Sequence, residues 1–158
     1  MSKLFNISEA TIIAFHSLAL MDKATLVRAE TVSSTTRASK NHVLKVLNQL
    51  SKHGYIKSIR GPKGGFQLNK APESIKLLEV FEMMEGPIQP SPCGLTLEEC
   101  PFNSCVFGDI TFKLTKMFVD FLKDKTVKQI AEINLKKTDL EEKIDIGNLN
   151  QAHHTEAE

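Results

Sequence analysis

Apolar residues recur at helical spacing in three segments of the first half of the chain. In residues 8–21 they lie three and four positions apart, and Ser8 stands where a helix N-cap belongs. A short helix is predicted over roughly 29–35. A third helix follows Ser39, a second N-cap candidate, and Gly54 stands where a residue of left-handed conformation would end it.

A β-hairpin is predicted directly after the third helix, in the stretch YIKSIRGPKGGFQLN of residues 55–69. Tyr55, Ile56 and Ile59 favour a strand, and FQLN alternates apolar and polar residues as a return strand. RGPKGG between them forms a turn, because Pro fixes φ and Gly supplies positive φ. Helices followed by a hairpin are the order of a winged helix-turn-helix, so the predicted fold class is mainly α with a small β-hairpin wing.

The second half of the chain is predicted to contain an amphipathic helix over 75–86, a Pro-rich loop and a long helix from about residue 107. The long helix carries a coiled-coil-like apolar stripe. Its members are Phe107, Ile110, Leu114, Met117 and Phe121, widened by Phe118 and Leu122. The stripe predicts a dimerisation helix, with packing onto the N-terminal domain as the alternative. Thr126 and Gln129 match the capping box of a short terminal helix.

The bulk composition is that of a globular protein, with 41% hydrophobic and 25% charged residues among 158. No apolar run approaches the roughly 20 residues of a membrane span, so no membrane partner is expected. The N-terminus lacks the apolar core and cleavage site of a signal peptide. The expected location is therefore the cytoplasm, where thiols are kept reduced.

The net charge of +1 hides an uneven distribution of acidic residues. The 42 residues between Glu30 and Glu73, here called the acid-free span, contain no Asp or Glu and carry eight cations. The remaining chain has 12 basic and 19 acidic residues, hence a net charge of −7. A basic third beside an acidic remainder indicates that one part of the chain meets a polyanion. The alternative is a basic face that only contacts solvent.

Double-stranded DNA is the expected polyanion. The predicted DNA-binding residues are Ser39, Lys40, Asn41, His42, Lys45, Arg60 and Lys63. In a helix-turn-helix the N-terminal end of the second helix of the motif enters the major groove, where Asn41 and His42 can reach base edges. Lys45 follows one turn later and can touch a base or a phosphate. In the wing, Arg60 is expected in the minor groove and Lys63 at a phosphate. For each of them the alternative is an ordinary surface residue.

All three cysteines, Cys93, Cys100 and Cys105, fall in the segment 90–109. In a reducing compartment clustered cysteines indicate metal or redox chemistry rather than disulfides. Soft thiolates select iron–sulfur clusters, zinc or copper(I), and a metal-free thiol switch is a further alternative. The sequence lacks the phosphate loops, HExxH motif and nucleophile elbow of common enzymes, so an enzyme is not expected.

Residues 50–87, LSKHGYIKSIRGPKGGFQLNKAPESIKLLEVFEMMEGP, carry a resemblance to a known family. The wing text RGPKGG, the following aromatic residue and the helix ending in EGP are similar to those of bacterial winged-helix regulators of the IscR and NsrR type. The resemblance covers roughly residues 4–135. It implies a homodimeric repressor or regulator with a long crossing dimerisation helix. It also implies a 4Fe–4S or 2Fe–2S cluster held by Cys93, Cys100 and Cys105.

The resemblance also suggests how the fourth ligand of such a cluster is supplied. Gly108 stands where IscR-like relatives have a His, so that ligand is absent here. Glu9 matches the acidic residue that NsrR-like relatives contribute from the other subunit; Asp109 and His16 are weaker candidates. Nitric oxide, or else oxidants and iron–sulfur status, is the expected signal. The alternatives are a cluster-free regulator with a zinc site or thiol switch, and an adaptor that binds proteins.

These predictions divide the chain into four parts. Residues 1–86 form the winged helix-turn-helix DNA-binding domain, and 87–106 form the cysteine-bearing cluster loop. Residues 107–135 form the dimerisation helix with the short terminal helix, and 136–158 form a flexible tail.

Overall fold

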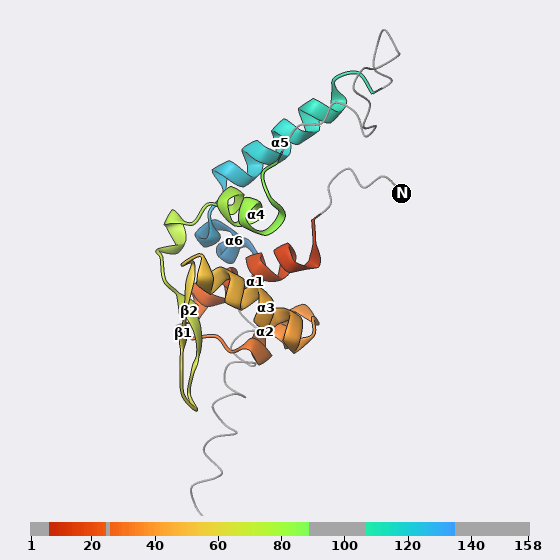
Figure 1. Ribbon diagram of the computed structural model, residues 1–158. Helices are drawn as coiled ribbons and strands as arrows, with labels where there is room; N and C mark the ends of the chain where they lie inside the picture. The colour runs from red at the N-terminus through yellow and green to blue at the C-terminus, as the bar shows by residue number, and fades with distance from the viewer. Residues whose placement is uncertain (1–6, 25, 89–106, 135–158) are drawn as a thin grey trace, which may run out of the picture.

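The computed structural model describes residues 7–24, 26–88 and 107–134. In chain order its elements are α1 (Glu9–Lys23), α2 (Ala29–Thr36), α3 (Lys40–Lys52), β1 (Ile56–Ile59), β2 (Gly65–Leu68), the 3-10 helix η1 (Pro72–Ser74), α4 (Leu77–Glu85), α5 (Ile110–Asp124) and α6 (Val127–Asn134). The prediction of a mainly helical fold with a small hairpin wing is confirmed. Figure 1 shows the wing and the N-terminal end of α5 projecting from opposite ends of the helical body.

Local signals set the ends of the N-terminal helices as predicted. The Ser8 hydroxyl accepts from the Thr11 N–H at 3.2 Å, and the Ser39 hydroxyl accepts from the His42 N–H at 3.2 Å. Each contact satisfies a backbone donor that the helix itself leaves without a partner. Gly54 follows α3 with φ of 77°, the left-handed conformation expected after a helix.

The wing is an antiparallel pair, β1 with β2, that gains a third backbone partner from the segment before α2. Val27 and Phe66 exchange two backbone hydrogen bonds of 2.8 Å each. A Cβ on Gly65 would lie 2.8 Å from the Val27 carbonyl oxygen, so this close approach requires glycine. Of the three glycines in the turn only Gly61 has positive φ, at 118°. A Cβ on Gly64 would lie 2.2 Å from the Ile59 oxygen, so Gly64 is also required for space.

One apolar core joins α1, α3, α4 and α6. Fully buried side chains from these helices include Leu18, Leu47, Val80 and Val127. Burying each such side chain contributes on the order of 1.5–3 kcal/mol to folding. The core places α3 firmly on the body, so the helix that carries most of the predicted DNA-binding residues has a fixed orientation.

The terminal helix α6 packs back onto α1. The side chain of Asp22, at the end of α1, is only 3% exposed, and its Oδ1 lies 3.5 Å from Nζ of Lys128. The predicted capping box is confirmed, because the Thr126 N–H donates to Oε1 of Gln129 at 3.0 Å and the Gln129 N–H donates to the Thr126 hydroxyl at 3.4 Å. α6 therefore belongs to the same packed unit as the N-terminal helices.

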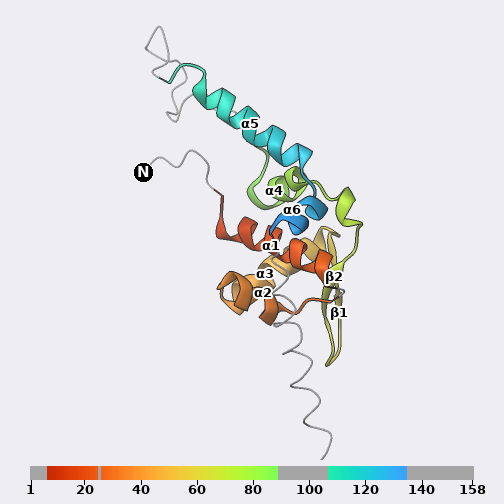
Figure 2. The same cartoon turned by 180° about the vertical axis from the view of Figure 1, so that it is seen from behind.

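The helix α5 begins at Ile110, three residues after the predicted start. Gly108 has φ of 57°, a left-handed conformation that interrupts a right-handed helix before Ile110. Viewed from behind in Figure 2, α5 again extends away from the body, with its C-terminal end above α4 and α6. In the described ranges of the chain, no helix is both long and apolar enough to cross a lipid bilayer.

The apolar stripe of α5 divides between two surroundings. Phe118 packs edge-on against Phe81 of α4 with ring centroids 5.3 Å apart, and Leu122 is buried. These two residues, predicted to widen a dimer stripe, therefore pack within the chain. Met117 and Phe107 remain 67% and 62% exposed. Exposed apolar surface of this kind is typical of a face that meets another molecule.

Candidate nucleic-acid interface

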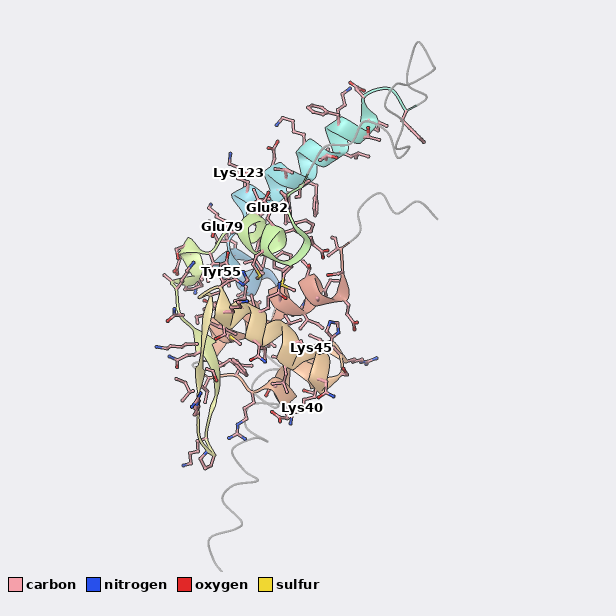
Figure 3. All side chains as sticks on the ribbon, viewed as in Figure 1. Lys40, Lys45, Tyr55, Glu79, Glu82 and Lys123 are labelled. Carbon is pink, nitrogen blue, oxygen red and sulfur yellow. The ribbon has the colours of Figure 1, made fainter. Side chains whose placement is uncertain are left out.

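The predicted DNA-binding residues lie on the start of α3 and on the wing turn. Each of them is exposed except His42, which is half-buried. Figure 3 shows Lys40 and Lys45 on α3, in the half of the molecule that also carries the wing and away from Lys123 on α5. Arg60 and Lys63 lie in the turn between β1 and β2. The structure thus places all seven residues on two neighbouring projections.

The amphipathic pattern of α3 determines which of its residues face outward. Val43, Val46, Leu47 and Leu50 are buried against the core. Because successive residues of a helix are about 100° apart, the exposed residues Asn41 and Lys45 fall on the opposite side, and Lys40 is exposed at the open first turn of the helix. The capped N-terminus and this polar face are the part of α3 that can enter a DNA groove.

The turn that precedes α3 is held by specific backbone geometry. Arg37 has φ of 58°, which is uncommon for a residue with a side chain. The Ser33 hydroxyl donates to the Ala38 carbonyl at 2.7 Å across the turn. These features fix the angle between α2 and α3, on which the entry of α3 into a groove depends.

A carboxylate from outside the acid-free span contacts the first residue of α3. Lys40 Nζ donates to Glu30 Oε1, and both side chains are exposed. The hydrogen bond from Lys40 is the main reason that the pKa of Glu30 lies below its ordinary value. Glu30 is therefore a charged carboxylate at neutral pH, and it lies beside the start of α3, the predicted recognition helix.

A second carboxylate, Glu9 of α1, reaches the same end of α3. Its Oε2 lies 3.3 Å from Nδ1 of His42. The sequence placed Glu9 in a metal site and His42 at base edges. The structure joins the two residues, because the start of α1 packs beside the start of α3.

Arg28 is a residue of this surface that the sequence did not indicate. It precedes α2, and its Nη2 donates to the Pro62 carbonyl in the wing turn at 3.4 Å. Arg28 lies just outside the acid-free span, so the charge pattern did not include it. Only the Val27–Phe66 pairing, which brings this segment beside the wing, reveals its position.

The predicted cluster ligands are only partly placed by the structure. Cys93, Cys100 and Cys105 lie outside the described residues, so their role as metal ligands stays a prediction. Within residues 7–24, 26–88 and 107–134, no group of three His, Cys, Asp or Glu side chains could hold a metal ion. The side chain of Glu9 is 67% exposed, so its carboxylate is open to solvent. Three thiolates and one such carboxylate fit an iron–sulfur site chemically.

The alternative fourth ligands are engaged in local contacts. His16 Nδ1 lies 2.8 Å from the carbonyl oxygen of Ile12, one turn earlier in α1. Asp109 Oδ2 lies 2.8 Å from Nζ of Lys113, an exposed pair at the start of α5. Both contacts stay within one helix, whereas the contact of Glu9 with His42 joins α1 to α3.

Comparison with known proteins gives a consistent result. The profile of the Rrf2 family, described as "Iron-dependent Transcriptional regulator", matches residues 7–133. The HTH-type transcriptional regulator NsrR of Bacillus licheniformis is 35% identical over 130 residues, covering 81% of this chain and 91% of that protein. NsrR of Shouchella clausii is 31% identical over 116 residues, covering 72% and 78%.

Solved structures share the fold at lower identity. CymR, the global cysteine regulator of B. subtilis, has a TM-score of 0.68 at 20% identity, covering 83% of this chain and 99% of that one. T. potens IscR has a TM-score of 0.59 at 21% identity, covering 84% and 93%. At this level of identity the likeness concerns the fold alone.

Proposed function

The chain belongs to the Rrf2 family of iron-dependent transcriptional regulators, and on this premise we propose that it is a homodimeric repressor that senses nitric oxide or redox state through an iron–sulfur cluster. Members of the family are transcriptional regulators, so the prediction that the chain is not an enzyme is confirmed. The observation that carries the proposal is the capped, exposed start of α3 beside the wing, within a span of 42 residues that lacks acidic side chains.

In this proposal α3 enters the major groove and the wing follows the adjacent minor groove. Asn41 presents an amide that can make two hydrogen bonds to an adenine edge, and His42 lies beside it. Lys45 and Lys63 neutralise phosphates. Arg60, exposed in the wing turn, enters the minor groove.

The cluster would be held by Cys93, Cys100 and Cys105, with Glu9 of the partner subunit as fourth ligand. When bound, a 4Fe–4S or 2Fe–2S cluster with one carboxylate ligand supplies an iron that nitric oxide or oxidants can reach. The 35% identity to a protein named NsrR supports this assignment. The exposed carboxylate of Glu9, at the first residue of α1, supports it independently.

Glu9 also connects the proposed sensing site with the recognition helix α3. Its carboxylate lies 3.3 Å from His42, and a carboxylate directed toward another subunit cannot keep this contact. The orientation of His42 at the groove therefore depends on where Glu9 points. This coupling requires no movement of the core, because both residues lie at helix starts on the surface.

The dimer would form through the exposed face of α5. Two copies place two α3 helices on one side of the assembly, as a two-fold symmetric operator requires. A dimer also doubles the number of phosphate contacts, which strengthens binding and makes it depend more steeply on salt.

The first test is an ultraviolet–visible spectrum, with iron and sulfide analysis, of protein purified without oxygen. We expect visible absorbance and bound iron in the wild type, and their loss in Cys100→Ala. Glu9→Gln should retain iron with an altered spectrum. Iron-free protein after anaerobic reconstitution would overturn the cluster. Zinc analysis and thiol titration would then separate the zinc site from the thiol switch.

Duplex DNA binding at several salt concentrations tests the regulator itself. We expect selected genomic fragments to bind with a steep salt dependence. Lys45→Gln should weaken binding and reduce the slope of log K against log salt by about 0.9 per subunit. Absence of salt-dependent binding to any duplex would favour a protein-binding adaptor.

A further inference from the structure

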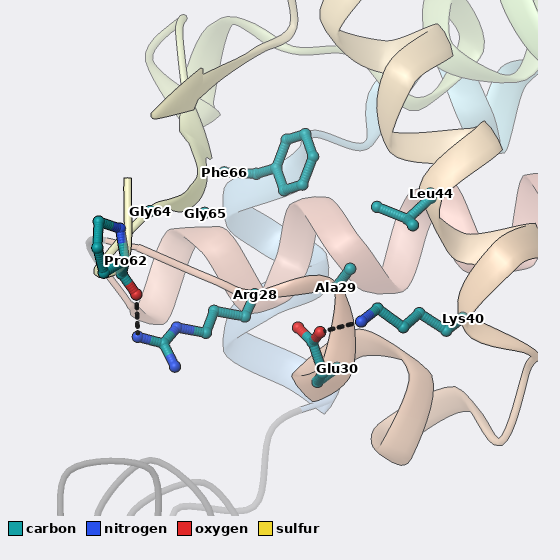
Figure 4. A pocket seen from close by; sticks show the side chains of 9 residues that line it. All are labelled: Arg28, Ala29, Glu30, Lys40, Leu44, Pro62, Gly64, Gly65 and Phe66. Carbon is teal, nitrogen blue, oxygen red and sulfur yellow. Dashed lines mark hydrogen bonds and ion pairs between the residues drawn. The ribbon is translucent and has the colours of Figure 1, made fainter. Parts of the chain in front are cut away.

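A cavity of about 430 Å³ separates the start of α3 from the wing. Figure 4 shows Arg28 and Glu30 at the start of α2, Lys40 on α3 and Pro62 in the wing turn around it. Leu44 and Phe66 form its inner wall. The cavity thus has an apolar base and a rim with two cations and one carboxylate.

The position of the cavity follows from how a winged helix contacts DNA. If α3 enters the major groove and the wing enters the adjacent minor groove, one sugar–phosphate strand must pass between them. That strand lies over the space between α3 and the wing, which is the cavity. Its phosphates then face the rim that Arg28 and Lys40 form.

The ammonium group of Lys40 is paired with the Glu30 carboxylate. Arg28 is directed toward the wing by its hydrogen bond to the Pro62 carbonyl, 3.4 Å long. A phosphate at the rim is attracted by both cations and repelled by the Glu30 carboxylate. Lys40 carries a single positive charge, which the Glu30 carboxylate already balances, and two anions around one ammonium group repel each other, so Glu30 and a phosphate compete for Lys40.

The geometry points to this cavity as the binding site of one DNA backbone phosphate, which Arg28 and Lys40 would bind. Glu30 competes with that phosphate for Lys40. The inference rests on the proposed DNA binding and adds residues and a role that it lacks. A loosely bound duplex leaves the Lys40–Glu30 pair intact and is repelled by Glu30. A duplex seated at its operator exchanges Glu30 for phosphate. Glu30 therefore lowers affinity for random DNA more than affinity for the operator.

The test measures binding of the full-length chain to a random-sequence duplex and to a selected fragment, at several KCl concentrations. For Glu30→Gln we expect random-duplex affinity to rise about two- to fivefold per subunit, with a smaller rise for the selected fragment. Glu73→Gln is the matched control, because it removes the same charge from an exposed site on η1. Equal effects of the two substitutions on random DNA would overturn the role of Glu30.

Arg28→Gln tests the phosphate contact from the other side of the cavity. We expect the salt slope to fall by about 0.9 per subunit, as for the loss of one phosphate contact. Lys123→Gln on α5, which Figure 3 shows far from Lys40, should leave the slope unchanged. An unchanged salt slope in Arg28→Gln would contradict the proposed phosphate-binding site.

A double-mutant cycle isolates the exchange at Lys40. If Glu30 acts by occupying Lys40, the gain from Glu30→Gln should disappear in a Lys40→Gln background. A gain that persists without Lys40 would show a general charge effect and overturn the exchange.

A DNA-independent measurement separates failure of this inference from failure of the proposed function. Inorganic phosphate is titrated into Glu30→Gln protein while NMR follows the Arg28 side chain and the backbone amides of residues 28–30. We expect saturable shifts that are weaker in the wild type and lost when Arg28→Gln is added. Such shifts in a protein that does not bind DNA would support the phosphate site and reject the proposed regulator. DNA binding without such shifts would support the regulator and reject the phosphate site.

Discussion

Glu85, at the end of α4, forms hydrogen bonds to the start of α1, which lies far from it in the sequence. Its Oε1 accepts from the Ser8 N–H at 2.8 Å and also from the Thr11 hydroxyl, which is fully buried. Burial opposes the charged form of Glu85, yet the hydrogen bonds from Ser8 and Thr11 outweigh it and lower the pKa of this carboxyl. A carboxylate at a helix N-terminus also complements the helix dipole.

Replacing Glu85 with Gln should therefore make stability depend differently on pH. The lowered pKa means that the carboxylate stabilises the folded state above the unfolded pKa, near 4.3, and that this contribution is lost as pH falls through the folded value. Because Glu85 is exposed, we expect only about 0.5–1 kcal/mol loss in the free energy of unfolding at pH 7. The difference from wild type should shrink as the pH falls below the unfolded pKa, as measured by urea unfolding.

Glu82→Gln provides the control for this experiment. Glu82 is an exposed residue of the same helix, one turn earlier (Figure 3). It should show no comparable difference from wild type at either pH. A Glu85→Gln protein as stable as wild type at pH 7 would contradict the capping role.

At this scale the sequence predicted local contacts and missed distant ones. The caps at Ser8 and Ser39 follow from neighbours three residues away, which a pattern can reveal. The partners Glu30, Glu9 and Glu85 come from other elements, and only packing brings them to their targets. Two of these distant carboxylates lie beside the start of α3. The surface of the recognition helix is therefore less basic than the acid-free span alone suggests.

Among the elements, the wing depends most on a single close backbone contact. Val27 forms hydrogen bonds to Phe66, and Gly65 allows its carbonyl to approach. This contact ties the wing to the segment that carries Arg28. The wing is thus a three-segment structure rather than an isolated hairpin, which would be only marginally stable in water.

Gly65→Ala should displace the wing while leaving the helices folded. The added methyl group would meet the Val27 oxygen at 2.8 Å, and we expect a loss of about 1–3 kcal/mol in the free energy of unfolding. Hydrogen exchange of the Phe66 N–H should become faster, and duplex binding should weaken. Ser58→Ala, an exposed change on β1, serves as control. Unchanged exchange of the Phe66 N–H would contradict this account.

The elements themselves were largely predictable, and their bounds less so. The hairpin followed from RGPKGG between apolar runs, and α3 from its buried stripe. The start of α5 was misplaced because the conformation of Gly108 is not evident in an apolar repeat. The pairing of Val27 with Phe66 was missed because one residue adds no strand-like pattern.

For the whole molecule, the exposed side of α5 is an apolar surface that the described chain leaves open to solvent. Ile110, Met117 and Phe121 lie on one side of the helix, each at least 46% exposed. Phe118 and Leu122, on the adjoining side, already pack on the body. An apolar face of this kind beside a packed one suits association with a second copy.

Met117→Lys should therefore weaken the proposed dimer without unfolding the subunit. Burying an ammonium group in an apolar interface is costly, so we expect the dimer dissociation constant to rise at least about tenfold. Sedimentation velocity over a range of concentrations measures this, and thermal unfolding checks the fold. Lys123→Gln, on another side of α5, should leave the dissociation constant unchanged. A wild-type chain that stays monomeric throughout would reject the dimer.

The assembly of the whole was the least predictable level. A repeat of apolar residues cannot tell which part of α5 packs within the chain and which part remains exposed. The return of α6 onto α1 rests on contacts such as Asp22 with Lys128, which join the two ends of the described chain.

The backbone joint at the base of α5 has a mechanical consequence. The Leu77 N–H donates to the Lys125 carbonyl and the Val127 N–H to the Ile75 carbonyl, each at 3.0 Å, so the C-terminal end of α5 is fastened to the link between η1 and α4. Beyond Phe118, which packs on Phe81, the helix back to Ile110 is about 12 Å long, and a bend of about 10° at Phe118 moves its tip by about 2 Å. Force applied at the tip of α5 is therefore borne first by the contact between Phe118 and Phe81, and then by the two backbone hydrogen bonds.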